Sequence, residues 1–209
     1  MGCDFSTLSG SAEERKSSIN LQTPVDVVQH KLILVGDISV GKSSLVQRLL
    51  GKGFREEHIS TIGTAFASVT IQPQEGMEPT TLQVWDTAGE ERYRSMSRFF
   101  FRGTQVGILV FDVQVPETLK KLRSWHEDII KVSPSASFIV VANKIDCAPD
   151  KRLVSSEEGR YFADEINAKY AETSAKTEEG VLDMFKQAAI MSIENIGKDS
   201  EGNAARSSE

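Results

Sequence analysis

Apolar residues in this chain fall into short runs that alternate with stretches of helical spacing, beginning near Gln29. Short continuous apolar runs indicate buried strands, and apolar residues that recur every three to four positions indicate amphipathic helices. Strands are predicted at residues 31–35, 64–72, 81–86, 106–113, 137–142 and 169–173. Helices are predicted at residues 42–50, 117–131, 156–169 and 178–195.

Strands and helices alternate along most of the chain, which favours a mostly parallel sheet with helices on both faces. The strands at 64–72 and 81–86 are joined by a link rich in turn residues, which predicts one antiparallel edge strand. We therefore expect a six-stranded α/β domain over residues 29–195, with ligands bound at the C-terminal ends of the strands. Residues 1–28 and 196–209 are polar, and we expect a flexible arm and a disordered tail.

Composition narrows the classes of function. The chain has 209 residues, with 24 basic and 30 acidic side chains and a formal net charge of −6. Interleaved charges argue against nucleic-acid binding, which needs clustered Lys and Arg. No apolar run approaches the roughly 18 to 20 residues that cross a bilayer, and no secretory signal is present. The two cysteines, Cys3 and Cys147, cannot form a disulfide framework, so we expect an intracellular protein, and a monomer.

A phosphate-binding pattern follows the first strand. Residues 36–43 read Gly-Asp-Ile-Ser-Val-Gly-Lys-Ser and fit Gly-x4-Gly-Lys-Ser/Thr; we call them the phosphate loop. Backbone N–H groups of such a loop wrap phosphates at a helix N-terminus, a lysine lies between the β- and γ-phosphates, and a hydroxyl holds Mg²⁺. A glycine-rich turn that binds nothing is the alternative. The predicted phosphate contacts are Ser39, Val40, Gly41, Lys42, Ser43 and Ser44.

A second phosphate element is predicted at the end of the third strand, where the chain reads Trp85-Asp86-Thr87-Ala88-Gly89. Asp86 is placed to support Mg²⁺ through a water molecule. Gly89 can offer its N–H to the γ-phosphate from a loop that moves when this phosphate leaves.

Asn143-Lys144-Ile145-Asp146 follows the fifth strand and predicts which base is bound. The Asp146 carboxylate can accept hydrogen bonds from guanine N1–H and N2–H, whereas adenine would leave it without donors. Asn143 would tie neighbouring loops together, and the Lys144 stem can lie over the base. Residues 174–176 (Ser174, Ala175 and Lys176) would supply backbone N–H groups, with Ala175 the donor to guanine O6. A solvated turn is the alternative interpretation.

These elements, in this order and spacing, resemble the small GTPases of the Ras superfamily over about residues 30–195. Finer features at residues 60–66, 82–93 and 101–103 resemble the Rab family, and the sequence of residues 60–66 is most similar to the endosomal branch of that family. The resemblance implies a P-loop NTPase G-domain that binds GTP, GDP and Mg²⁺ and hydrolyses GTP. Its implied partners are effectors, an exchange factor and a GTPase-activating protein.

The resemblance also implies roles for residues that spacing alone leaves open. Thr61 would reach Mg²⁺ and the γ-phosphate in the GTP state, and Phe54 would pack against the guanine. Phe66, Trp85 and Phe100 would form an aromatic triad that effectors read, although these aromatics could equally be plain core.

Two residues depart from the family's pattern. Glu90 stands where a glutamine usually orients the attacking water, and Ile38 brings bulk into the phosphate loop. An ionised glutamate only accepts hydrogen bonds and adds negative charge beside the γ-phosphate. With Lys42, Thr61, Gly89 and Glu90 as the catalytic set, we expect slow intrinsic hydrolysis. The alternative is a scaffold that holds GTP almost permanently.

Membrane attachment is expected at the N-terminus. Rab proteins ordinarily end in prenylated cysteines, but no cysteine follows Cys147. Residues 1–6 read Met-Gly-Cys-Asp-Phe-Ser, which fits the myristoylation pattern with Gly2 as acceptor. One myristoyl chain binds membranes only reversibly, so palmitoylation of Cys3 would supply a second chain. Coincidence is the alternative for so short a motif. We expect the cytoplasmic face of endosomal or vesicular membranes.

Overall fold

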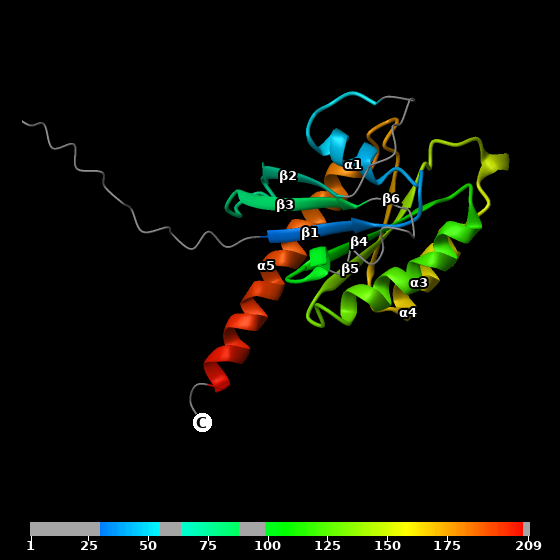
Figure 1. Ribbon diagram of the computed structural model, residues 1–209. Helices are drawn as coiled ribbons and strands as arrows, with labels where there is room; N and C mark the ends of the chain where they lie inside the picture. Colours follow the sequence, from blue (N-terminus) through cyan, green and yellow to red (C-terminus); the bar gives the residue numbers. More distant parts are fainter. Residues whose placement is uncertain (1–29, 55–63, 88–98, 207–209) are drawn as a thin grey trace, which may run out of the picture.

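A computed structural model describes residues 30–54, 64–87 and 99–206 (Figure 1). In these segments six strands form one sheet in the order β2-β3-β1-β4-β5-β6. The strands are β1 (His30–Val35), β2 (Thr64–Ile71), β3 (Thr80–Thr87), β4 (Val106–Asp112), β5 (Ser137–Asn143) and β6 (Lys169–Thr173). The helices are α1 (Lys42–Leu49), α3 (Pro116–Ile130), α4 (Ser156–Glu165) and α5 (Val181–Arg206), with a short 3₁₀ helix at Pro149–Lys151.

The sheet has the predicted mixture of directions. β2 runs antiparallel to β3, with Thr64 opposite Thr87 and Ile71 opposite Thr80, and the other neighbouring strands are parallel. Every residue of β4 is buried, as expected for a parallel strand covered on both faces. β2, at the edge, alternates between more and less exposed positions. The prediction of one antiparallel edge strand is therefore confirmed.

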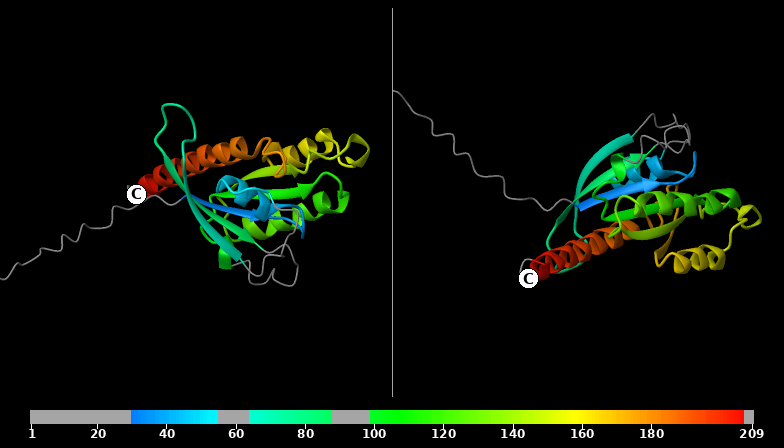
Figure 2. Two further views of the ribbon diagram at one scale, coloured as in Figure 1. Left: turned by 90° about the horizontal axis from the view of Figure 1, so that it is seen from above. Right: turned by 60° about the horizontal axis from the view of Figure 1, so that its bottom comes forward.

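Two hydrophobic cores lie on opposite faces of this sheet. Leu32 and Leu34 of β1 point to the core under α1 and α5, whereas Ile33 and Val35 point to the core under α3 and α4. Figure 1 and Figure 2 show how α5 (red) and α3 (green) lie about the sheet, and the packing of Phe162 and Ala163 assigns α4 to the same core as α3. Period-two alternation along a strand thus fills both cores.

The third predicted helix ends earlier than expected. Its start is capped: Ser155 Oγ accepts from Glu158 N–H at 3.1 Å, and Glu158 Oε2 accepts from Ser155 N–H at 2.8 Å. The helix ends at Glu165 rather than at residue 169, because Asn167 has a φ of +53° and turns the chain into β6.

The last helix differs from its prediction at both ends. It begins at Val181 rather than at residue 178, because Glu178 and Gly180 have φ values of +74° and +67°. It continues to Arg206, so residues 196–206 are helical where the sequence favoured a disordered tail. Extending a helix that is already anchored needs no new nucleus. None of the described helices is both long and apolar enough to cross a bilayer.

A polar network joins β6 to the start of α4. Glu172 accepts hydrogen bonds from Arg152 Nη2 at 2.6 Å, from Ser156 Oγ at 2.7 Å and from Tyr170 Oη at 2.8 Å. Burial alone would raise the pKa of Glu172, but these three donors and the charge of Arg152 lower it to about 2. The ionised carboxylate therefore stabilises the fold.

This depressed pKa predicts an acid-sensitive contribution to stability. The contribution is complete above the unfolded pKa of about 4.5 and is lost as pH falls toward about 2. Because solvent screens this partly exposed group, we expect about 1 kcal/mol rather than the full value of the shift. Urea unfolding at pH 6 should show Glu172→Gln to be less stable than the parent, with the difference shrinking by pH 3. Glu165→Gln, which removes an exposed ion pair with Arg123, is the control. A constant difference between pH 6 and pH 3 would contradict the prediction.

Candidate functional site

A cavity of about 460 Å³ opens at the C-terminal edge of the parallel strands. The loops after β1, β5 and β6 supply most of its wall, as expected for a ligand site of a parallel sheet. Nine of the predicted ligand contacts line it: Ser39, Gly41, Ser44, Phe54, Asn143, Lys144, Asp146, Ala175 and Lys176. Sequence reasoning missed Gln114, Cys147, Ala148 and Lys151, which also line it. Three of these closely follow Asp146, and Gln114 follows β4, so the rule that ligands bind where strands end could have found them.

Lys42 is folded back into the phosphate loop. Its Nζ donates to the carbonyl oxygens of Gly36 at 2.9 Å and Asp37 at 2.8 Å. Burial lowers the pKa of Lys42 to about 8, against the raising effect of Asp86 and Asp37. A buried ammonium at the start of α1 is suited to an anionic ligand.

The phosphate loop approaches β5 so closely that position 41 must be glycine. Gly41 has a φ of +99°, and a Cβ there would lie 2.3 Å from Asn143 Nδ2. A side chain would therefore both strain the backbone and displace the amide of Asn143.

Ser43 and Asp86 meet across the first helix and the third strand. Ser43 Oγ donates to Asp86 Oδ2 at 2.5 Å, and Asp86 Oδ1 is buried with no hydrogen-bond partner in the described part of the chain. Burial raises the pKa of Asp86, while the Ser43 hydroxyl and the charge of Lys42 oppose this. A hydroxyl and a carboxylate oxygen without a partner are hard ligands that fit Mg²⁺.

This pair alone does not make a metal site. Within residues 30–54, 64–87 and 99–206, no three His, Cys, Asp or Glu side chains form a group that could hold a metal. Mg²⁺ ordinarily binds through one or two protein ligands together with substrate phosphates. The two residues thus fit a Mg²⁺ ion that a phosphate ligand helps to hold.

The buried side chain of Asn143 connects three segments around the cavity. Its Nδ2 donates to Val40 O at 2.8 Å, and its Oδ1 accepts from Thr173 Oγ1 at 3.1 Å and Ala175 N at 3.3 Å. The prediction that Asn143 ties neighbouring loops together agrees with these bonds. The Ala175 N–H group, the predicted donor to the base, donates a long hydrogen bond to Asn143 Oδ1. Its contact with a base therefore stays a prediction.

Asp146 is exposed at the cavity and is oriented by the loop after β6. Ser174 Oγ donates to Asp146 Oδ1 at 2.6 Å and accepts from the N–H groups of Lys176 at 3.2 Å and Thr177 at 3.0 Å. The neighbouring Lys144, with a φ of +68°, forms an ion pair with Asp112 through Nζ and Oδ2 at 2.6 Å. Asp146 therefore offers a carboxylate of fixed direction to a ligand in the cavity.

The three predicted effector aromatics lie together away from this cavity. The ring centroids of Phe66 and Trp85 are 5.1 Å apart, and those of Trp85 and Phe100 are 5.5 Å apart. Phe66 is 53% exposed, whereas Trp85 and Phe100 pack against the core under α3 and α4. The triad is thus partly core and partly a surface.

Five predicted residues cannot be placed. Thr61, Gly89 and Glu90 of the catalytic set, and Gly2 and Cys3 of the acylation motif, lie outside the described residues.

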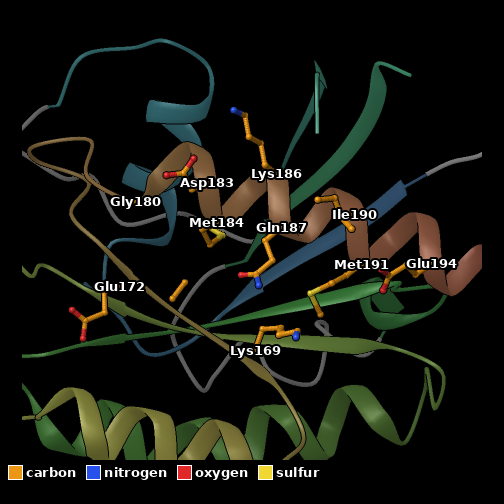
Figure 3. A pocket seen from close by; sticks show the side chains of 11 residues that line it. Lys169, Glu172, Gly180, Asp183, Met184, Lys186, Gln187, Ile190, Met191 and Glu194 are labelled. Atoms are coloured by element: carbon orange, nitrogen blue, oxygen red, sulfur yellow. The ribbon is translucent and has the colours of Figure 1, made fainter. Parts of the chain in front are cut away.

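Two further cavities lie outside the strand ends. One of about 610 Å³ runs between α5 and β6, where Lys169, Asp183, Lys186 and Glu194 line it with both signs of charge (Figure 3). The other, of about 690 Å³, lies between α3 and α4. Neither contains a residue of the phosphate loop or of residues 143–146, so the cavity at the strand ends is the candidate site.

Comparison with known proteins identifies a family and several relatives of this chain. A family model described as the Ras family matches residues 31–194. The chain is 38% identical over 162 residues to the GTP-binding protein ypt5 of Schizosaccharomyces pombe, covering 77% of this chain and 76% of the relative. It is 39% identical over 160 residues to the Ras-related protein Rab5 of Nicotiana tabacum, covering 76% and 78%. It is 35% identical over 175 residues to the Ras-related protein RabC of Dictyostelium discoideum, covering 83% and 88%.

The contact between Gly41 and Asn143 predicts a specific loss of nucleotide binding. Gly41→Ala should weaken GDP binding at least about tenfold, because the new Cβ displaces an amide that makes buried hydrogen bonds. Gly76→Ala is the matched control, because Gly76 also has a positive φ, of +83°, but open space around it. Both variants carry a similar backbone cost of about 1–2 kcal/mol. GDP titration of the two proteins tests this, and equal affinities would contradict it.

Proposed function

This chain belongs to the Rab small GTPases of the Ras family, which bind GTP and GDP with Mg²⁺ and hydrolyse GTP, and we propose that it is a membrane-attached switch of vesicular trafficking. In the GTP state it recruits effectors, and hydrolysis ends the signal. An exchange factor and a GTPase-activating protein complete the cycle. The likeness to ypt5 and Rab5 supports an endosomal membrane.

The bonds of Asn143 carry the proposal for the nucleotide. They join the phosphate loop to the segment after β6, so that phosphates and base occupy one continuous cavity. Residues 39–44 hold the phosphates, Asp146 accepts from guanine N1–H and N2–H, and Ala175 donates to guanine O6. Phe54, which lines the cavity, packs against the base.

Mg²⁺ binding rests on Ser43 and Asp86, with Thr61 added in the GTP state. The Ser43 hydroxyl would bind the ion directly and Asp86 through water, which gives the unpartnered Asp86 Oδ1 a hydrogen-bond donor. The ion, when bound, neutralises charge that develops on the phosphate oxygens. Lys42 adds a second positive charge to the same oxygens.

Hydrolysis is proposed to be slow without a partner. Glu90 cannot donate a hydrogen bond when ionised, and its charge opposes the developing charge of the γ-phosphate. Ile38 is 45% exposed in the phosphate loop, where its bulk would obstruct an arginine supplied by an activating protein. The exposed Ile38 also favours a second candidate function, a membrane scaffold that remains mostly GTP-bound.

The aromatic cluster of Phe66, Trp85 and Phe100 is the proposed effector surface. The exposed ring of Phe66 offers apolar area to a partner, and Trp85 fixes its position through an edge contact. Because β2 and β3 connect this surface to Asp86, a change at the phosphates can reach it along the strands.

Glu90→Gln tests the account of hydrolysis. In single-turnover assays of Mg²⁺·GTP, the parent should be slower than the roughly 4 × 10⁻⁴ s⁻¹ typical of Ras, and Glu90→Gln should be at least about tenfold faster than the parent. Glu91→Gln removes the same charge one residue further on and should leave the rate unchanged. A parent as fast as Ras would refute the role given to Glu90 and would favour an ordinary timed switch.

Gly2→Ala tests the membrane anchor. Full-length protein produced with an N-myristoyltransferase should bind phosphatidylcholine vesicles at about 10⁴ M⁻¹, and Gly2→Ala should abolish this binding. Gly10→Ala, in the same N-terminal arm, is the control. In cells, Cys3→Ser should convert stable attachment into exchangeable attachment, because one acyl chain remains. Membrane sedimentation of Gly2→Ala at the level of the parent would rule out acylation as the anchor.

A further inference from the structure

Arg48 links the helix after the phosphate loop to the segment after β6. It lies in α1, and its guanidinium donates through Nε to Ala175 O at 2.7 Å and through Nη2 to Lys176 O at 2.7 Å. Its Nη1 forms an ion pair with Glu178 Oε1 at 2.5 Å. The Arg48 side chain is only 13% exposed, whereas Glu178 is 66% exposed. The bond to Ala175 O is partly buried, whereas the bond to Lys176 O and the ion pair with Glu178 are exposed.

These two carbonyls belong to peptide groups whose N–H groups point the other way. In a trans peptide the C=O and the next N–H are antiparallel, and no cis peptide occurs in the described residues. The N–H groups that pair with these carbonyls are those of Lys176 and Thr177, and both donate to Ser174 Oγ. Arg48 thus holds one side of two peptide planes, and Ser174 holds the other.

The Ser174 hydroxyl has no freedom left in this arrangement. It accepts two N–H groups with its oxygen, so its single hydrogen is free for one acceptor, Asp146 Oδ1 at 2.6 Å. A continuous chain of hydrogen bonds runs from the Arg48 cation through two peptide groups and a hydroxyl to the Asp146 carboxylate. Bonds in such a chain polarise and strengthen one another, particularly when charged groups stand at the ends.

We propose that Arg48 is a positioning residue for guanine recognition, which acts on Asp146 through the peptide groups of residues 175–177 and the Ser174 hydroxyl. This inference rests on the proposed role of Asp146 as the acceptor of guanine N1–H and N2–H. Arg48 does not touch the base itself. Without it, the two peptide groups can rotate, Ser174 loses its fixed hydrogen direction, and the carboxylate loses its alignment.

The test compares binding of GDP with binding of inosine diphosphate (IDP), which lacks the exocyclic 2-amino group. A misaligned Asp146 weakens two bonds to GDP but one to IDP. Arg48→Met, which keeps most of the side-chain length but no donor, should lower GDP affinity at least about tenfold. The ratio of GDP to IDP affinity should fall by about threefold or more, which a general loosening of the fold would not cause.

Three further variants control for other effects of the Arg48→Met substitution. Glu178→Gln removes the exposed ion pair but keeps both carbonyl bonds, and should leave the ratio unchanged. Arg123→Met removes an arginine of α3 that pairs with Glu165 away from the cavity, and should also leave it unchanged. Arg48→Lys keeps the charge, but one ammonium lacks the planar fork that reaches both carbonyls, so its ratio should be intermediate.

Each outcome is decisive. If the parent binds GDP and IDP equally, the role of Asp146, and with it the proposed base recognition, is wrong. If the parent discriminates and Arg48→Met loses both ligands in proportion, Arg48 only supports the fold. If Arg48→Met does not fold, the folded Arg48→Lys decides, and an unchanged ratio there overturns the inference.

Discussion

The rest of the site depends on one buried amide, that of Asn143. Its Nδ2 reaches the phosphate loop at Val40, and its Oδ1 reaches β6 at Thr173 and the following loop at Ala175. A buried amide that lost one of these partners would carry an unsatisfied polar group at a cost of about 1–3 kcal/mol. The phosphate loop and the segment after β6 therefore cannot shift independently. The requirement for glycine at position 41 follows from this amide, because it occupies the space of a Cβ.

The register of the sheet puts Asn143 where it can make these bonds. Asp112, Asn143 and Thr173 are direct partners across β4, β5 and β6, so the three strands end at one level. The residues that follow them form the wall of the cavity, and Lys144 pairs with Asp112 just beyond the strand ends. Because parallel strands deliver their C-terminal ends to one edge, residues far apart in sequence become neighbours without any long loop.

This register marks the limit of what the sequence could predict. The six strands match their predicted bounds within one residue at each end, because apolar runs report burial directly. Short contiguous motifs were enough to predict four of the ligand contacts, Lys42, Ser43, Asn143 and Asp146. The contact of Arg48 with Glu178 joins residues 130 positions apart, and no local pattern reports it. The extension of α5 to Arg206 was missed because its polar composition resembles a tail, whereas helix continuation depends on the part already packed.

Burial of two charged side chains favours the binding of charged ligands at this site. Burial lowers the pKa of Lys42 and raises that of Asp86, which means that keeping either side chain ionised costs free energy. Their mutual attraction and the Ser43 hydroxyl offset only part of this cost. Nucleotide phosphates would supply negative charge to Lys42, and Mg²⁺ would supply positive charge to Asp86, so that both costs fall together. Release of the nucleotide must restore both costs at once. Exchange is therefore expected to be slow unless a partner separates the phosphate loop from Mg²⁺, and this coupling would make the bound nucleotide a persistent signal.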